Sequence, residues 1–334
     1  MPALAPQELV NVIINAFNQS GYNAIFTSPN LRTHPRKFKV SDGNETFSVW
    51  VYIWTITHGG RKTLPDEYRI QLTSVISPLP KNPEGYTVLL GFYPDLDVFG
   101  GFDLRKHENF TSGSPSIQIN ISAFNDALQN GFGFSTKDNE EVAIGIRSDQ
   151  LINYIVNSEN LHEHGAEAAV INLLNRAASN QEINDADING LSSDRQQIIT
   201  NIKRYSRNAN FRKMVINAYD NRCAITRIQL KLVEAAHILP VPVDDSSDHV
   251  TNGIALSPTM HRAYDNCLIY LDEEYRIQLN DEKVRDLQRL GIDGGLDYVR
   301  SLMNRRIHLP QDASQRPNVE YILRANNHRR IPRY

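Results

Sequence analysis

The sequence predicts an α+β protein of two domains, and three observations lead to this prediction. The chain has 334 residues, which is more than one hydrophobic core usually holds. With 40 % hydrophobic and 22 % charged residues, its composition is that of a globular protein and not of a disordered one. A polar, turn-rich stretch at residues 178–194 interrupts the apolar patterns. We therefore expect a first domain over residues 1–175, a linker over 176–195 and a second domain over 196–334.

The first domain is predicted to mix helices and strands without internal repeats. Residues 7–21 carry apolar side chains at helical spacing and end at Ser20 and Gly21, a common helix stop. Residues 46–57 are aromatic and β-branched on both alternating faces, as in a strand that is covered on two sides. The other expected elements are strands at 68–76, 86–93, 116–121 and 141–146 and helices at 121–128 and 150–162.

A basic segment of this domain is a candidate for reading DNA. Residues 93–109 contain Gly100 and Gly101 beside aromatic side chains, followed by Arg105 and Lys106. A flexible loop of this kind would suit entry into a groove or the holding of a flipped base, with Arg105 and Lys106 as DNA-binding residues. The alternative is a long hairpin with a solvated, charged end.

The second domain is predicted to begin with a long helix over residues 194–219, broken near Asn208. An apolar strand over 232–237 ends in His237, and a polar loop over 244–251 leads to a second short strand over 253–256.

A short helix is predicted to follow these strands. Ser257 is a good N-cap residue and Pro258 suits the first helical position. His261 and Asp265, four residues apart, then fall on one face of the helix and could hold one ion together. Two strands and a helix would enclose a small metal site.

This arrangement resembles the HNH endonucleases, the ββα-metal nucleases, in their Ala-His-Ile subgroup. The matching segments are Ala236-His237-Ile238, residues 252–256, which begin with Asn252 and Gly253, and residues 261–265, which read His-Arg-Ala-Tyr-Asp. Residues 211–226 and Leu309-Pro310 also match this subgroup, so the resemblance covers roughly the last 130 residues, the size of one domain. It does not reach the first domain.

The resemblance implies a ββα-metal nuclease domain with flanking helices that hydrolyses phosphodiester bonds in DNA. His237 matches the general base, and Asn252 matches the residue that holds the loop by hydrogen bonds so that the ring is correctly aimed. His261 and Asp265 match the ligands of one divalent cation, Mg²⁺ or Mn²⁺. Arg262 is a candidate for contact with the scissile phosphate, the alternative being an exposed helix arginine.

Two departures from the family pattern affect the metal. Many members carry an aspartate or histidine immediately before the general base, where this chain has Ala236. Glu234 lies on the same face of the strand by alternation, but it cannot be assumed to replace that ligand. Some relatives bind a structural zinc through two cysteine pairs, whereas here Thr226 stands where the partner of Cys223 would be. We expect no structural zinc.

The charge distribution and the composition of the chain indicate which partners the protein binds and in which cellular compartment it works. Residues 201–334 hold 21 Lys and Arg against 16 Asp and Glu, a net charge of +5, while residues 1–200 hold 14 against 22, a net charge of −8. The basic half is the better candidate for contact with a polyanion such as double-stranded DNA, although a solvated basic tail is the alternative. The sequence contains no apolar run of membrane-span length, no signal-peptide pattern and only two cysteines, so we expect a cytoplasmic protein that does not bind membranes.

The leading hypothesis is a metal-dependent DNA endonuclease of restriction or anti-phage defence, in which residues 1–175 recognise the target. Fusion of a reader domain to an HNH core looks like bacterial restriction enzymes, including those that depend on modified bases. Two alternatives stay open: a nuclease effector whose first domain senses a small molecule or protein, and a DNA-binding module whose HNH site has decayed. Because one HNH site cuts one strand, a double-strand break requires either a homodimer or two successive nicks.

Overall fold

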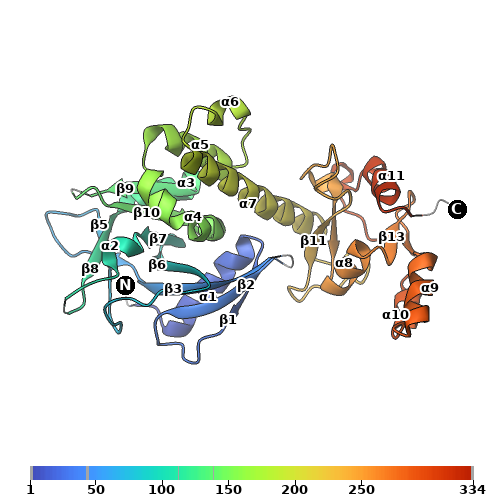
Figure 1. Cartoon of the computed structure of the whole chain (residues 1–334), viewed down its shortest axis with the longest axis horizontal. Helices are drawn as coiled ribbons and strands as arrows, with labels where there is room; N and C mark the ends of the chain where they lie inside the picture. Colours follow the sequence, from blue (N-terminus) through green and yellow to red (C-terminus); the bar gives the residue numbers. More distant parts are fainter. Residues whose placement is uncertain (1–2, 43–44, 112, 138, 332–334) are drawn as a thin grey trace. The chain divides into compact units, whose positions relative to one another are not determined.

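The protein divides into two compact units, Met1–Ala209 and Asn210–Tyr334. The computed structural model describes residues 3–42, 45–111, 113–137 and 139–331 (Figure 1). Both units mix helices and strands, which confirms the predicted α+β class.

The first unit contains most of the strands. Its helices are α1 (Pro6–Gln19), α2 (Leu104–His107), α3 (Ile121–Asn130), η1 (Ser148–Gln150), α4 (Leu151–His164), α5 (Ala168–Ala178), α6 (Asp185–Ile188) and the first part of α7 (Ser193–Ala218). Its strands are β1 (Asn23–Phe26), β2 (Arg36–Ser41), β3 (Thr46–Thr55), β4 (Thr57–His58), β5 (Glu67–Gln71), β6 (Gly85–Tyr93), β7 (Val98–Phe102), β8 (Ser116–Asn120), β9 (Phe132–Thr136) and β10 (Val142–Arg147).

A seven-stranded sheet forms the centre of this unit, in the order β1-β2-β3-β6-β7-β10-β9. Neighbouring strands are antiparallel except for β3 and β6, which run parallel. Strands β4, β5 and β8 form a separate three-stranded antiparallel sheet. The connection between β3 and β6 passes through β4 and β5, so the parallel pair is joined by a crossover.

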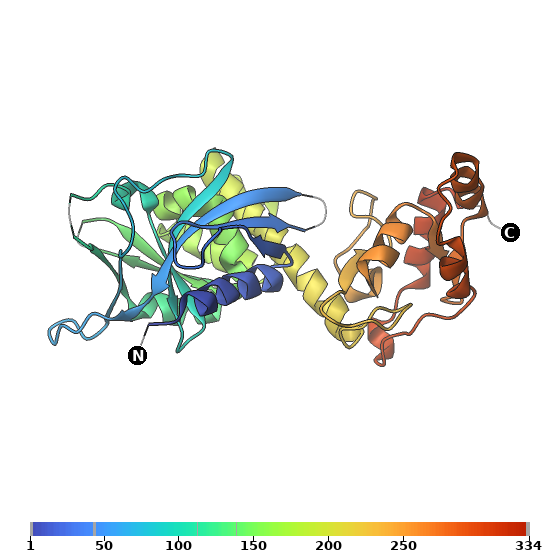
Figure 2. The same ribbon diagram turned by 90° about the horizontal axis from the view of Figure 1, so that it is seen from below.

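Both faces of the large sheet are covered. On β3, Val49, Val51 and Ile53 pack into a core with side chains of α1, α4, α5 and α7. The alternating Tyr52 and Trp54 pack into a second core with the small sheet and α3. This is the two-sided burial that the sequence of this strand predicts. Figures 1 and 2 show the ribbon of the sheet and of the helices of this unit.

The predicted linker at 176–195 is wrong. Ala177, Ala178 and Ile183 are buried in the core of the first unit, and Ile188 and Leu191 pack against it. The polar composition of 178–194 reflects an exposed outer face and turns between short helices, while its few apolar residues anchor the segment. The first unit extends to Ala209, beyond the predicted boundary at residue 175.

Helix α7 is continuous and is not broken near Asn208. Ile198, Ile199 and Ile202 belong to the core of the first unit, whereas Phe211 and Val215 belong to the core of the second. The apolar period therefore changes near Asn208 because the buried face of the helix changes from one core to the other.

Residues 98–102 form strand β7 and not a flexible loop, which corrects the interpretation of Gly100 and Gly101. A Cβ atom at Gly101 would lie 2.5 Å from the ring of Tyr154, and one at Gly100 would lie 3.0 Å from Ile56. These glycines allow close packing of neighbouring side chains against the strand.

The second unit is built around the end of α7 and two strand pairs. Its strands are β11 (Glu234–His237), β12 (Gly253–Leu256), β13 (Ile269–Leu271) and β14 (Ile277–Leu279), and its helices are η2 (Val250–Asn252), α8 (Pro258–Asp265), α9 (Asp281–Leu290), α10 (Leu296–Ser301), η3 (Ala313–Gln315) and α11 (Val319–His328). One apolar core joins the end of α7, the four strands, η2, α8, α10 and α11. Within the described ranges, none of the helices has both the length and the apolar character of a membrane span.

Candidate active site

Two antiparallel strands and a helix position the predicted catalytic residues. Strands β11 and β12 pair so that His237 lies opposite Gly253. Ser257 is the N-cap residue of α8 and Pro258 its first residue, as the sequence predicts, although the serine side chain makes no capping hydrogen bond. Met260 and Tyr264 bury one face of α8 in the core of the second unit.

His237 is held on two sides at the end of β11. Its ring stacks on that of Phe211 from α7, with centroids 3.7 Å apart and an angle of 10° between the planes. Its Nε2 lies 3.0 Å from Oδ1 of Asp248, and 19 % of the histidine side chain stays exposed. Because an ionised carboxylate only accepts hydrogen bonds, Nε2 carries the proton, and Nδ1 of the neutral ring is an acceptor.

Asn252 ties together both ends of the loop between the two strands. Its side chain is fully buried; its Oδ1 accepts from the backbone N–H of Leu239 at 2.8 Å, and its Nδ2 donates to the carbonyl of Leu239 at 3.1 Å. Nδ2 also donates to the carbonyl of Ser247 at 2.9 Å. Ser247 directly precedes Asp248, so Asn252 also restrains the backbone beside the carboxylate that meets His237. These are the bonds that a loop-holding role requires.

His261 lies between two carboxylates. Its Nδ1 donates to Oε2 of Glu234 at 2.7 Å, and its Nε2 lies 3.4 Å from Oδ2 of Asp265. The hydrogen bond from His261 lowers the pKa of Glu234, against the effect of partial burial, and the charges of Arg212 and Arg262 act in the same direction as the hydrogen bond. Glu234 is thus an ionised partner that orients the His261 ring.

The residues around His261 fit a divalent ion that takes only some of its ligands from protein. Among the described residues, no group of three or more His, Cys, Asp and Glu side chains is arranged to hold a metal ion. Ala236 is buried in β11 and offers no ligand atom, and Glu234 is engaged by Nδ1 of His261. This leaves Nε2 of His261 and the half-exposed carboxylate of Asp265. Mg²⁺ is commonly held by one or two carboxylates, substrate phosphates and water, so such a sparse set is compatible with it.

Several residues of this site were missed by sequence reasoning. Phe211, Asp248 and Arg212 were not singled out, and Glu234 was considered only as a metal ligand. Arg212 is half-buried; its Nη2 donates to the carbonyl of Val233 at 3.3 Å, and burial lowers the pKa of its guanidinium. The position of Asp248, eleven residues after His237, carries no periodicity that would have identified it.

The predicted DNA-binding residues occupy different environments. Arg262 is exposed on α8, next to His261. Arg105 and Lys106 lie on α2 in the first unit, where Arg105 contacts both carboxylate oxygens of Asp103 at 2.9 Å and lies 3.4 Å from Glu163. Lys106 is exposed. The structure therefore brings together the site residues of the second unit, while the positive charge of Arg105 is largely balanced by neighbouring acids.

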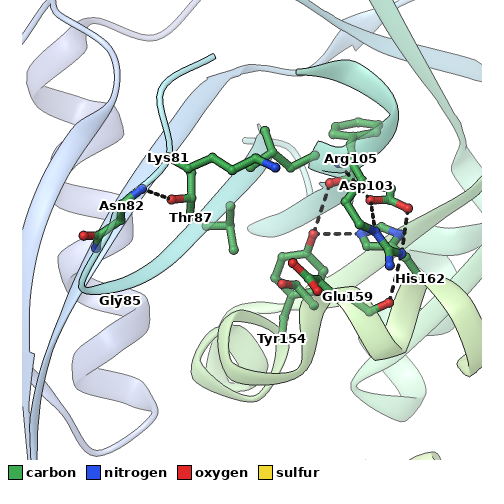
Figure 3. Close-up of a pocket in the computed structure, with 13 residues that line it drawn as sticks. Lys81, Asn82, Gly85, Thr87, Asp103, Arg105, Tyr154, Glu159 and His162 are labelled. Atoms are coloured by element: carbon green, nitrogen blue, oxygen red, sulfur yellow. Dashed lines mark hydrogen bonds and ion pairs between the residues drawn. The ribbon is translucent and has the colours of Figure 1, made fainter. Parts of the chain in front are cut away.

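Arg105 also lines a cavity of about 200 Å³ in the first unit. Figure 3 shows side chains from β6 and the segment before it facing Asp103 and Arg105 from the end of β7 and α2, with Tyr154 and His162 of α4 below.

Comparison with known proteins identifies two families in the chain. Residues 223–272 match the family described as HNH endonuclease, and residues 47–155 match the family described as Methylase-associated X1. No curated protein matches the chain. Among solved structures, the "Modification dependent TagI restriction endonuclease" aligns with a TM-score of 0.27 and 10 % identity, over 84 % of this chain and 80 % of that chain. The second unit thus contains an HNH endonuclease domain, which confirms the resemblance seen in the sequence, and the protein is a nuclease.

Proposed function

We propose that this protein is a metal-dependent DNA endonuclease of restriction or anti-phage defence, in which the second unit cuts DNA and the first selects it. The observation that carries this proposal is the ββα site, where a carboxylate engages Nε2 of His237 and another engages Nδ1 of His261. This leaves Nδ1 of His237 for proton transfer and Nε2 of His261 beside the carboxylate of Asp265. A site that had decayed to a binding module would not need to keep both histidines oriented in this way.

In the proposed reaction, His237 acts as the general base. Its Nδ1 accepts a proton from water while the water oxygen bonds to phosphorus, and the P–O bond to the leaving oxygen breaks. Asp248 fixes the proton on Nε2, and the stacked ring of Phe211 restricts rotation, so Nδ1 stays available in one orientation. Asn252 holds the loop that carries Asp248.

His261 and Asp265 would hold one divalent cation, Mg²⁺ or Mn²⁺, with Glu234 orienting the His261 ring. Such an ion offsets the negative charge that develops on the phosphoryl and leaving oxygens. Arg262, which is exposed and adjacent to His261 in the chain, would contact a phosphate of the substrate.

We further propose that the first unit recognises double-stranded DNA, with Arg105 and Lys106 near the contact. The description of its family as methylase-associated supports a setting in which DNA modification and cleavage are linked. This is the reason for proposing selection by modification, in a cytoplasmic protein that either dimerises on its target or nicks each strand in turn.

Cleavage of plasmid DNA tests this function directly. The full-length protein would be incubated with Mg²⁺ or Mn²⁺ and with plasmids that carry cytosine, 5-methylcytosine or 5-hydroxymethylcytosine. We expect metal-dependent cleavage of one class of plasmid, and none by His237→Ala. Absence of cleavage from every plasmid with either ion would contradict the proposal.

A ligand-activated nuclease is the second candidate, because the cavity in the first unit is of a size to hold a small molecule. Cleavage of unmodified plasmid only after addition of a soluble ligand would favour this function over DNA reading.

A further inference from the structure

The cavity of the first unit is small and has mixed polar walls. Its volume is about 200 Å³, below the roughly 300–1,000 Å³ of pockets that enclose drug-sized ligands. It has room for a single ring system and not for a whole nucleotide or a peptide. Phe102 and Val88 contribute apolar surface. The remaining walls are largely polar, as the labelled side chains of Figure 3 show.

One wall contains buried polar groups that the nuclease chemistry does not use. His162 is 7 % exposed and Tyr154 is fully buried. Nδ1 of His162 donates to the carbonyl of Val142 at 2.8 Å, so Nε2 accepts from the hydroxyl of Tyr154 at 2.9 Å. Burial lowers the pKa of His162 to about 4, which keeps the ring neutral at physiological pH. Buried polar networks of this kind, beside a cavity, are typical of binding sites.

The same wall presents hydrogen-bond acceptors. The hydroxyl of Tyr154 donates a hydrogen bond to Nε2 of His162, so its oxygen keeps lone pairs that can accept hydrogen bonds. Asp103 is 5 % exposed; burial would raise the pKa of its carboxyl, but the hydrogen bonds and charge of Arg105 outweigh burial and lower it, so the group is ionised. Glu159 adds an exposed carboxylate at the rim.

The opposite wall carries a positive charge. Lys81, which also pairs with Glu108, is half-exposed at the rim and can donate to a ligand, whereas the amide of Asn82 beside it already donates to the carbonyls of Ser48 and Tyr86. Acids on one wall disfavour a purely anionic ligand, and the bases Lys81 and Arg105 disfavour a purely cationic one. A neutral, planar ring with donors on one edge and acceptors on another satisfies both walls, as the Watson–Crick edges of cytosine and adenine do.

We propose that this cavity binds one nucleobase, whose sugar and phosphate stay outside near Lys81 and the exposed Lys106. The inference rests on the proposed function and names the ligand of the first unit. The base can belong to a nucleotide extruded from a duplex or to a free nucleotide, because both present the same ring to the cavity.

Binding of defined duplexes by the full-length protein, without divalent ion, tests the proposal. The duplexes carry cytosine, 5-methylcytosine, 5-hydroxymethylcytosine, adenine or N6-methyladenine at one position, next to 2-aminopurine, whose fluorescence rises when its neighbour leaves the stack. Free dCMP, 5-methyl-dCMP and dAMP are titrated by calorimetry. Ser158→Trp fills the cavity, and Ser122→Trp, at an exposed serine of α3, is the matched control.

We expect the wild type and Ser122→Trp to prefer one duplex by about 10-fold or more, with a fluorescence rise, and Ser158→Trp to bind all duplexes alike. Thermal melting checks that Ser158→Trp folds. Lys81→Gln, at the half-exposed rim, provides a second variant and should weaken the preferred duplex a few-fold while reducing the salt dependence of binding.

The outcomes separate this proposal from the wider function. If Ser158→Trp is folded and keeps the preference, the cavity is not the base site, while DNA reading by the protein stands. If no duplex is preferred but free nucleotides bind and Ser158→Trp abolishes this, the nucleobase site stands and the DNA-reading function falls. If neither duplex preference nor nucleotide binding is observed, both the nucleobase site and the DNA-reading function are overturned.

Discussion

Replacing Asn252 by alanine is expected to lower the free energy of unfolding of the second unit by about 2–6 kcal/mol. The N–H of Leu239 would lose its buried acceptor, which costs about 1–3 kcal/mol. The carbonyls of Leu239 and Ser247 would each lose the hydrogen bond that Asn252 donates. The carbonyl of Leu239 keeps a bond from Ser246 and that of Ser247 is partly exposed, so each loss adds only about 0.5–1.5 kcal/mol.

The same substitution should slow DNA cleavage by about 100-fold, because the freed loop no longer keeps Asp248 in place against His237. Asn266→Ala is the control, since Asn266 is exposed at the end of α8. The two effects would show that Asn252 acts through the loop and not through contact with substrate.

Hydrogen exchange over residues 234–256, followed by mass spectrometry, measures this loss of stability. Tryptophan fluorescence cannot report it, because Trp50 and Trp54 both lie in the first unit. Single-turnover cleavage measures the rate. A variant that exchanges like the wild type and cleaves at its rate would show that the loop is held by other contacts, and the argument from buried hydrogen bonds would be wrong.

His237→Ala should reduce single-turnover cleavage by roughly 100- to 10,000-fold with DNA binding and melting nearly unchanged; a wild-type rate would refute its role as base. Asp248→Ala should lower kcat without raising KM, and should have no further effect in a His237→Ala background, whereas additive losses would indicate a separate structural role. His261→Ala should abolish Mn²⁺ binding measured by calorimetry and Asp265→Asn should weaken it, while unchanged affinity in both would place the ion elsewhere. Burial would raise the pKa of Glu141, but its bonds to His107 and Lys137 outweigh burial and lower the pKa to about 2 from an ordinary 4.5. The ionised carboxylate therefore contributes about 3 kcal/mol at most to the free energy of unfolding above pH 4.5, and this contribution is lost as the pH falls towards 2. Glu141→Gln should flatten that part of the stability profile, measured by urea denaturation at each pH.

The identity of the nuclease domain could be predicted from the sequence because its signals are local. A histidine at a strand end, an Asn-Gly pair before the next strand, and His261 and Asp265 four residues apart on one helix are all visible as residue types at fixed spacing. Strands and helices impose periods of two and 3.6 residues, so these spacings already place the side chains on shared faces.

The partners of those residues could not be predicted. Asp248 reaches His237 across an irregular loop whose path depends on the buried bonds of Asn252. Glu234 contacts His261 through the packing of β11 against α8, and Phe211 reaches the His237 ring from α7. Such contacts depend on how separate elements pack, for which no single segment carries a signal.

The sequence alone determined the α+β class, the two-sided burial of residues 46–57 and the order of strand, loop, strand and helix around the catalytic residues. Only the tertiary structure decided that 178–194 packs into the first unit, that α7 runs unbroken through residue 208, and that Gly101 lies beneath Tyr154 in a strand. Local composition reports which residues are polar, whereas burial depends on which surfaces meet, and a few apolar side chains suffice to anchor a polar segment to a core that is already formed.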